Sequence, residues 1–226
     1  MTTMGTLTHA EPRLEEIINV HSTNGILHNH DKLERLLKGL DIENYAHSVR
    51  VEHLAEQLAA VNGVAPDYVE ALRIAGRYHD VGKTEIALEI LQKPGKLTSQ
   101  EFDVVKGHAE RGYNLLKEWI PREIAEIVLA HHYPDYPSAE RFRELTQKDV
   151  GLILPLAKYL IAADKVDAML YPRSYQPEFS PNMIRSKLRA NLKWMPGNET
   201  LIDQALGISV QQKYQKHPIS NTHPSF

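Results

Sequence analysis

Cysteine is absent from this chain of 226 residues, and a large excess of positive charge is absent too. Without cysteine there can be no disulfide, no thiolate nucleophile and no zinc–thiolate site. Chemistry must therefore come from His, Asp, Glu and Lys side chains. A net charge of −3 and a pI near 6.5 give no positive field that would draw the chain onto a phosphate backbone. Duplex nucleic acid is accordingly not an expected partner.

No hydrophobic run is long enough to cross a membrane. The most apolar stretch, residues 150–163, is interrupted by Pro155 and Lys158 and falls short of the roughly 20 residues that a spanning helix needs. The amino-terminal sequence MTTMGTLTHAEPR lacks the basic region followed by an apolar region that marks a secretory signal. We therefore expect a cytoplasmic protein that does not contact the membrane.

Alternating strand patterns are almost missing, whereas apolar residues recur at three-and-four spacing in one segment after another. This pattern predicts an all-α fold. The apolar share of 42% and the charged share of 24% are those of a globular chain, and the length suits one sizeable domain. We expect a single helical bundle domain over residues 13–215. The flanking segments 1–12 and 216–226 are expected to be tails.

Capping signals predict where the helices begin. The expected starts are Asp41, Pro66, Thr98, Pro121 and Asp149, with two more helices over residues 181–194 and 198–214. Asn62 and Gly63 are expected to end the first of these helices. Thr98 is followed three residues later by a glutamate, which is the spacing of a capping box. One continuous helix is expected to run from there past His108.

On five of these helices a histidine or an aspartate interrupts an apolar, core-facing stripe. One such histidine is usually a core residue whose hydrogen bonds are satisfied, but five helices with the same feature favour a common centre, because buried imidazoles and carboxylates need partners. The candidate metal ligands are Glu43, His47, His79, Asp80, His108, His131, His132 and Asp164. Eight ligands are more than one ion uses.

Adjacent pairs of candidates suggest more than one ion. Residues at i and i+1 of a helix point about 100° apart, so His79 with Asp80, like His131 with His132, suits two neighbouring ions. Asp80 has two carboxylate oxygens and could bridge them. Glu43 and its partner four residues later share a face, as two ligands of one ion should. Imidazole and carboxylate without thiolate suit iron, manganese or zinc, and a multinuclear site favours iron or manganese.

The order His47, His79–Asp80, Asp164 resembles the H…HD…D signature of the HD-domain phosphohydrolases. Several segments are similar to successive motifs of the HD-GYP subgroup. They are ENYAHSVR at 43–50, HDVGK at 79–83, LQKPGKLT at 91–98, GHAERGYNLL at 107–116 and ADKVDAMLYPRSYQP at 163–177. The resemblance covers roughly residues 43–177 and is far more specific than a single His-Asp pair.

The resemblance implies a metal-dependent phosphodiesterase that hydrolyses a cyclic dinucleotide, cyclic di-GMP or a relative, through a metal-bridging hydroxide that attacks phosphorus. Asp80 and Lys83 would be its catalytic residues, with the lysine neutralising charge on the phosphate. The residues expected to contact substrate are Arg50, Lys96 and Arg173. The position of Glu43 accompanies a third ion in this subgroup, so two or three divalent ions are expected.

Several residues also have plain structural explanations. Lys83 can be a helix-end charge, and Lys96 lies in a Pro-Gly turn followed by a helix cap. Asp167 can orient a ligand histidine or pair with Arg173, and Tyr175 can be a packing residue. The remaining histidines are interpreted as surface residues.

One departure from the subgroup leaves the substrate open. The paired histidines are followed by HHYPDYPSAERF rather than by a run that ends in Gly-Tyr-Pro. The alternatives are an HD-type nucleotidase or phosphomonoesterase, a di-iron oxygenase, and a non-catalytic nucleotide-sensing module. A sensing module should have lost ligands, whereas every expected ligand is present here.

The expected partner is a small nucleotide or cyclic dinucleotide. A homodimer and a separate signalling partner protein both stay open. No sensor or receiver domain is recognised, so a regulatory input is expected through the segment before Glu43 or through another chain.

Overall fold

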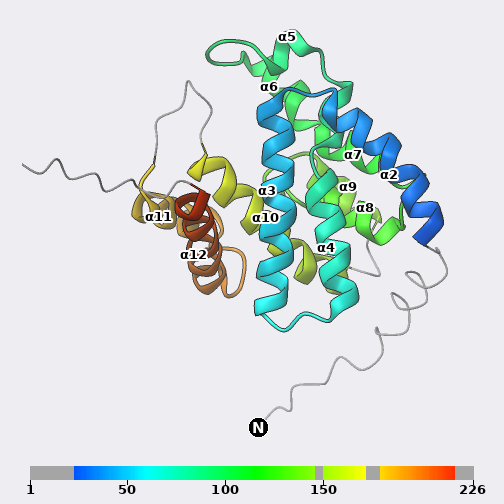
Figure 1. Cartoon of the computed structure of the whole chain (residues 1–226). Coiled ribbons are helices and arrows are strands. Elements are labelled where there is room, and N and C mark those ends of the chain that lie inside the picture. The colour runs from blue at the N-terminus through cyan, green and yellow to red at the C-terminus, as the bar shows by residue number, and fades with distance from the viewer. Residues whose placement is uncertain (1–22, 146–149, 172–178, 217–226) are drawn as a thin grey trace, which may run out of the picture.

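The computed structural model describes residues 23–145, 150–171 and 179–216, and in this part of the chain every regular element is a helix (Figure 1). The helices are α2 (Thr23–Lys38), α3 (Ile42–Val61), α4 (Pro66–Tyr78), the 3-10 helix η1 (Val81–Glu85), α5 (Leu88–Leu91), α6 (Ser99–Lys106), α7 (His108–Leu116), α8 (Arg122–Leu129), α9 (Ser138–Leu145), α10 (Val150–Leu170), α11 (Pro181–Asn191) and α12 (Asn198–Lys216). The all-α prediction is confirmed. The tail predicted for residues 1–12 lies outside the described residues. Of the tail predicted for residues 216–226, Lys216 is the last residue of α12 and the rest lies outside the described residues.

The capping signals place the helix starts correctly. The Asp41 side chain accepts a hydrogen bond from the Asn44 backbone N–H and caps α3, which ends at Asn62 as expected. Pro66 is in the first turn of α4. At α6 the Thr98 side chain and the Glu101 side chain each bond the other's backbone N–H, which is a complete capping box. These starts depend on local hydrogen bonds, so they can be read from sequence.

The prediction of one continuous helix past His108 is wrong. Gly107 separates α6 from α7, and it serves as the end residue of both. In α6 no residue is buried, whereas α7 buries His108, Ala109 and Gly112 among others. The break at a residue of low helix propensity lets α7 leave the line of α6 and pack against η1 and α8.

Four other expected ligands, the pairs at 79–80 and 131–132, lie beyond helix ends rather than within helices. His79 is the C-cap residue of α4, and Asp80 precedes η1. His131 follows the end of α8 by two residues. The expectation that both residues of each pair sit on one helix is therefore corrected: these side chains start where helices stop.

Helix α10 lies at the centre of the packing. It contacts α3, α4, α8, α11 and α12 (Figure 1). Its described apolar side chains between Ile153 and Val166 are buried with few exceptions. The most apolar stretch of the sequence is therefore the central buried helix of the protein core. None of the described helices is both long and apolar enough to cross a membrane.

Close contact between backbones fixes α3, α4 and η1 around this core. At Gly76 in α4 an added Cβ would lie 2.8 Å from the Cα of Glu52 in α3. At Gly82 in η1 an added Cβ would lie 2.0 Å from the carbonyl oxygen of His108. Since real Cβ atoms do not approach backbone atoms so closely, these two glycines allow the helices that carry the candidate ligands to meet.

Candidate metal centre

Six of the predicted ligands form two compact groups. One group is His47, His79 and Asp164, from α3, the end of α4 and α10. The other is His108, His131 and His132, from the start of α7 and the segment after α8. In each group one candidate ligand atom per residue lies within 4.8 Å of the others. The structure thus brings together residues that are up to 117 positions apart in the sequence.

Asp80 lies between the two groups. Its Oδ1 is 3.2 Å from Nε2 of His108, in the second group. Its Oδ2 is 3.4 Å from Nε2 of His79 and 3.8 Å from Nε2 of His47, in the first group. One carboxylate therefore directs one oxygen at each group, which is the arrangement expected of a bridge between two ions.

Three of the histidines are oriented in the same way. The Nδ1–H groups of His79, His108 and His131 donate to carbonyl oxygens three residues earlier, at Gly76, Val105 and Val128, over 2.9, 2.7 and 2.5 Å. Each of these carbonyls belongs to the last turn of a helix, where no intrahelical donor is available. A histidine just past a helix end thus satisfies that helix and directs its Nε2 away from it, towards the shared centre.

The fourth histidine is oriented by a carboxylate. Nδ1 of His47 lies 2.7 Å from Asp167 Oδ2. Arg50 donates from Nε and Nη2 to the two oxygens of the same carboxylate, over 2.8 and 2.9 Å, and its guanidinium stacks 4.3 Å from the centre of the Tyr171 ring. A ligand histidine held by a buried carboxylate is a usual outer layer of a metal site. Asp167 therefore has the orienting role that was one of its two expected roles.

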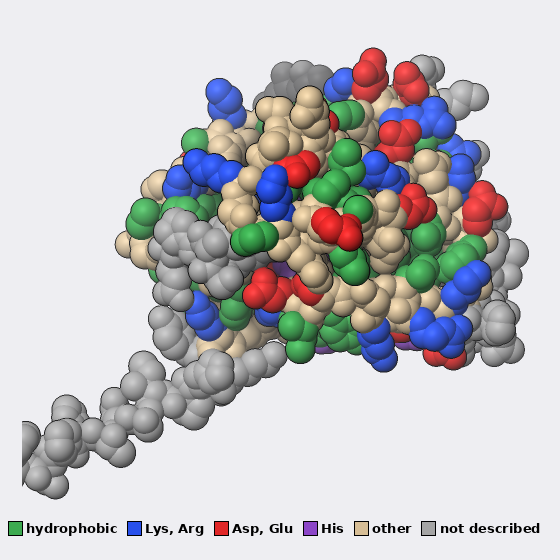
Figure 2. Space-filling view, turned by 90° about the horizontal axis from the view of Figure 1, so that it is seen from above, with side chains coloured by type: hydrophobic (Ala, Val, Ile, Leu, Met, Phe, Trp, Pro, Cys, Tyr) green, Lys and Arg blue, Asp and Glu red, His purple; other side chains and the backbone are tan. Residues whose placement is uncertain are grey.

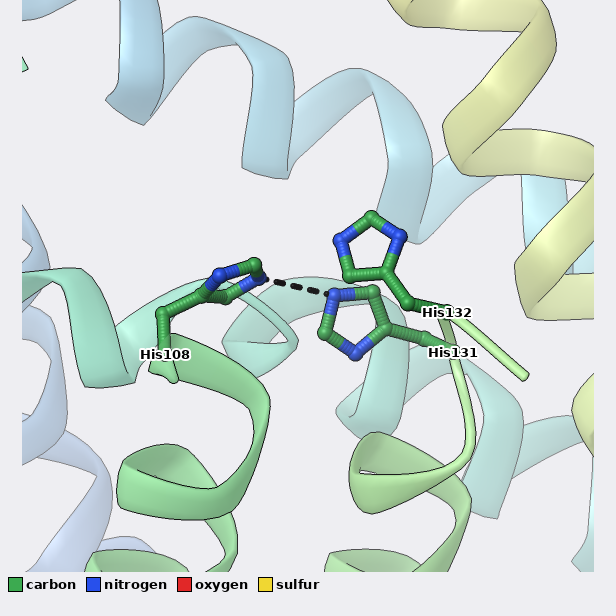
Figure 3. Close-up of side chains that lie close together, drawn as sticks. All are labelled: His108, His131 and His132. Atoms are coloured by element: carbon green, nitrogen blue, oxygen red, sulfur yellow. Dashed lines mark hydrogen bonds between the residues drawn. The ribbon is translucent and has the colours of Figure 1, made fainter. Parts of the chain in front are cut away.

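The donor set fits a metal ion better than it fits an empty site. Because Nδ1 of His108 and of His131 both donate to carbonyls, each neutral ring has its lone pair on Nε2, and these two nitrogens lie 3.0 Å apart (Figure 3). The Nε2 atoms of His47 and His79 lie 3.3 Å apart. Facing lone pairs repel unless a proton or a cation lies between them, whereas neighbouring ligands about 2.1 Å from one ion are separated by about 3 Å.

Burial and neighbouring charges shift the pKa of His47 in the opposite direction from the pKa values of His131 and His132 when no metal is bound. Burial lowers the pKa of His47, but the hydrogen bonds to Asp164 and Asp167 outweigh it and raise the pKa to about 9. Burial lowers the pKa of His132 to about 3 and that of His131 well below its ordinary value. His131 and His132 are thus neutral at physiological pH, as metal-binding imidazole must be.

The carboxylates are ionised in spite of their burial. Burial raises the pKa of Asp80, but the Lys83 ammonium and the surrounding imidazoles lower it well below the usual range. Burial also raises the pKa of Asp164, and the hydrogen bond with His47 outweighs it in the same way. Two negative charges at the centre of five imidazoles give a site that attracts divalent cations.

A cavity of about 710 Å³ opens onto both groups. His47, Asp80, His108, His132 and Asp164 all line it. In the view from above, a histidine side chain is visible deep between hydrophobic and charged side chains, and the basic and acidic side chains of the coloured surface are interspersed (Figure 2). The volume is within the range of pockets for small organic ligands.

Not every predicted site residue is part of this centre. Glu43 is exposed and lines the cavity from the first turn of α3, outside the two groups. Lys83 lines the cavity, contacts Asp80 Oδ2 closely and lies 3.4 Å from Asn44 Oδ1. Arg50 also lines it, with its guanidinium engaged by Asp167. Lys96 is exposed between α5 and α6 and does not line the cavity. Arg173 is outside the described residues.

Some cavity residues were not predicted. Tyr136 stacks on His132, with ring centres 4.0 Å apart and an angle of 29° between the planes, and burial raises its pKa to about 12. Lys165 and Tyr171 line the cavity from α10 and its end. The one available signal for Tyr136 was its place in the Asp-Tyr-Pro that follows the paired histidines. For Lys165 the only available signal was its position directly after the candidate ligand Asp164.

Comparison with known proteins agrees with this geometry. The family model described as HD domain matches residues 44–169, more than half of the chain. The chain belongs to the HD-domain family. The matched range contains every residue of the two groups, and the relatives below place the chain near the HD-GYP subgroup, as the resemblance in sequence indicated.

Among the most similar relatives of this HD domain are phosphodiesterases of cyclic dinucleotides. A cyclic di-GMP phosphodiesterase of Thermotoga maritima is 33% identical over 64% of this chain and 39% of its own length. The 3′3′-cGAMP-specific phosphodiesterase 2 of Vibrio cholerae is 32% identical over 66% of this chain and 28% of its own length. The chain thus matches well under half of the length of these curated relatives.

A solved structure has the same fold. The crystal structure of the HD domain of the phosphodiesterase PgpH from L. monocytogenes superposes with a TM-score of 0.55 over 90% of this chain and 99% of that chain. Sequence identity is 20%, so this likeness concerns the fold alone. It confirms the prediction of an HD-type helical bundle.

Proposed function

We propose that this chain is a metal-dependent phosphodiesterase that hydrolyses a cyclic dinucleotide, cyclic di-GMP or a relative such as 3′3′-cGAMP. The observation that carries the proposal is the placement of Asp80, whose two oxygens face two separate groups of imidazole and carboxylate ligands on the floor of one cavity. The names of the relatives supply the class of substrate.

Two divalent ions would be held by the two groups, with Asp80 between them. Hard carboxylates combined with imidazole, in the absence of thiolate, favour iron or manganese. Glu43 lies four residues before His47 and lines the cavity, where it could bind a third ion. This third ion remains a prediction. Bound divalent ions would supply Lewis acidity towards phosphate oxygens and a lower pKa for water at neutral pH.

The protein's own groups would bind and orient the phosphodiester. Lys83 holds its ammonium beside Asp80 at the cavity wall, where it can neutralise charge that develops on the phosphate. The buried Asp167, held by the partly exposed Arg50, keeps His47 in one orientation. The burial of His79, His108 and His131 keeps the ligands rigid, so the centre is organised before substrate arrives.

The relatives favour a diesterase over a phosphomonoesterase or an oxygenase, and the complete ligand set favours an enzyme over a sensing module. Lys96 and Arg173 keep their predicted roles in substrate contact as untested parts of the proposal. A cytoplasmic location, a homodimer and a separate signalling partner likewise stay predictions.

Metal content and hydrolysis, measured together, test the proposal. Protein purified without added metal should contain about two or three iron or manganese ions per chain and should hydrolyse cyclic di-GMP or 3′3′-cGAMP. Asp80→Ala should lose metal and all turnover, because one carboxylate serves both groups. Asp103→Ala is the matched control, since Asp103 is exposed on α6 and does not line the cavity.

The other outcomes are equally informative. Metal without hydrolysis of either dinucleotide would keep the metal centre and reject the substrate. Absence of metal under all conditions of loading would reject the central claim.

A further inference from the structure

Three lysine and arginine side chains from the described residues line the cavity, and two of them contact buried carboxylates. Arg50 makes two short hydrogen bonds to the Asp167 carboxylate. Lys83 contacts Asp80, the carboxylate at the centre of the site. Both charges are therefore balanced by buried acids of the metal centre itself. The third cation is Lys165.

Lys165 is placed differently. It directly follows Asp164 on α10, so its side chain leaves the helix about 100° away from that ligand. Its contact is with Asp135, 3.4 Å away, and Asp135 is half exposed, with 52% of its side chain accessible against 18% for Lys165. A long contact to an exposed carboxylate contributes little. The Lys165 ammonium is thus the cavity cation whose charge is least compensated.

The backbone under Lys165 is rigid. The neighbours Asp164 and Val166 are buried, and α10 is the central helix of the core. Asp135 belongs to the segment that directly follows the paired histidines, three residues after His132. Lys165 therefore lies on the side of the second group of ligands, where its contact with Asp135 connects α10 to this segment.

A cyclic dinucleotide has two phosphodiesters in one ring, and only one of them can be cleaved at the metal centre at a time. The other diester enters the same cavity with its negative charge, and burying a charge without a partner is costly. We infer that Lys165 binds this second, non-scissile phosphate of the substrate. The inference rests on the proposed function. It adds a physical reason why the cavity would bind a cyclic dinucleotide, which has two phosphates, in preference to a substrate with one.

A comparison of two substrates isolates this role. Cyclic di-GMP has two phosphodiesters, and bis(p-nitrophenyl) phosphate has one. With Lys165→Gln, KM for cyclic di-GMP should rise about tenfold or more, the effect of losing a charge-assisted hydrogen bond. The values of kcat and KM for bis(p-nitrophenyl) phosphate should stay within about twofold, and metal content should not change. Lys165→Arg should retain most of the affinity for cyclic di-GMP.

Two further variants sharpen the test. Asp135→Asn removes the competing carboxylate and should lower KM for cyclic di-GMP, which is the opposite direction. Lys158→Gln is the matched control, because Lys158 lies two turns earlier on the same helix, against the Tyr159 ring and away from the cavity. It removes the same charge from the chain and should change neither substrate's kinetics.

Each contrary result has a distinct meaning. An equal loss with both substrates would place Lys165 at the scissile phosphate, and no change with either would remove it from the site; both overturn the inference. Loss of metal in Lys165→Gln would also overturn it, because the residue would then support the centre. If the metal-loaded wild type hydrolyses bis(p-nitrophenyl) phosphate but no cyclic dinucleotide, the proposed function itself fails.

Discussion

At the scale of single residues, the centre depends on which nitrogen each histidine presents. A neutral imidazole has one donor and one acceptor, and the group bonded to Nδ1 decides which nitrogen is free for a metal. Carbonyls at three helix ends fix His79, His108 and His131, and a carboxylate fixes His47. Of these two ways to orient a histidine, only the carboxylate can be removed by mutation, because a substitution changes a side chain and not a backbone carbonyl.

We therefore predict that Arg50→Met weakens metal binding without unfolding the protein. Loss of the guanidinium removes both hydrogen bonds that hold Asp167 in place under His47. Outer partners of ligand histidines typically contribute about 10- to 100-fold in metal affinity. A competition titration with a chelator measures the change, and it should be confined to one of the two ions. Arg50→Lys should recover only part of it, since it cannot make the paired bonds.

The control is Arg185→Met, which breaks a contact between α11 and α12 with Asp203. Its metal affinity should equal that of the wild type. Equal loss of both ions in Arg50→Met, or unchanged affinity, would contradict the assignment of Arg50 to His47 alone.

The candidate ligands could be picked out from sequence, because polar residues that interrupt apolar faces need a partner. Their outer partners could be predicted only in part. Asp167 was expected to orient a histidine or to pair with Arg173, but its pairing with Arg50 joins residues 117 positions apart, and neither residue's type indicates the other. The same holds for Tyr136 on His132 and for Lys165, whose meaning depends entirely on the cavity that they line.

At the scale of helices, the position of the second ligand group is set by the contact of η1 with α7. Gly82 packs so closely on α7 that an added Cβ would lie 2.0 Å from the His108 carbonyl oxygen and 2.4 Å from the Gly112 nitrogen. Both neighbours are backbone atoms, which cannot rotate away. The HDVGK segment thus contributes a glycine for packing as well as ligands.

We predict that Gly82→Ala separates α7 from η1 and displaces His108. Overpacking of this kind typically destabilises a protein by about 1–3 kcal/mol, and the displacement should also lower the affinity for the ion at the second group. Chemical denaturation and metal titration of the same sample measure the two effects. Gly207→Ala is the control: its Cβ would meet nothing within 4 Å in α12, so it should leave metal binding unchanged and stabilise the helix slightly.

Helix starts were predictable because caps are local, whereas the break at Gly107 was not. Val104, Val105 and His108 have helical spacing, and the sequence alone does not show that α6 is exposed and α7 buried. The turn between them is decided by the packing of α7 on η1 and α8, which is tertiary. Helix α2 was not predicted either, although Leu33 and Leu37 are fully buried.

At the scale of the whole molecule, partly buried ion pairs attach α2 to the pair formed by α3 and α4. Arg77 of α4 donates to Glu34 of α2 from Nε and Nη2 over 2.7 and 2.6 Å, and to Glu52 of α3 over 3.4 Å. Arg77 also bonds the Tyr45 hydroxyl over 2.7 Å. One guanidinium, with 11% of its side chain exposed, therefore connects three helices just before the His79–Asp80 pair.

We predict that Arg77→Met destabilises the folded protein by about 3 kcal/mol, because it leaves the largely buried Glu34 carboxylate without its guanidinium partner. Glu52 keeps its bond from Arg73 and loses only the longer one from Arg77. Urea denaturation at pH 7 measures this as a lower midpoint with an unchanged slope. Arg141→Met is the control: its contact with Glu144 is exposed on both sides, so the change should be within about 0.5 kcal/mol. A similar loss of unfolding free energy in Arg77→Met and Arg141→Met would mean that the Arg77 network stabilises the protein no more than an exposed ion pair does.

The same network predicts how stability depends on pH. Burial raises the pKa of Glu34, but the hydrogen bond and charge of Arg77 outweigh it, so the folded-state pKa lies below the ordinary 4.5. A group with a lowered folded pKa contributes stability above its unfolded pKa and loses it as pH falls through the folded one. Wild-type stability should therefore fall more steeply below pH 4.5 than that of Glu34→Gln. If the free energy of unfolding falls in parallel for the two proteins between pH 5 and pH 3, the ionised Glu34 is not stabilised by Arg77 in the folded protein.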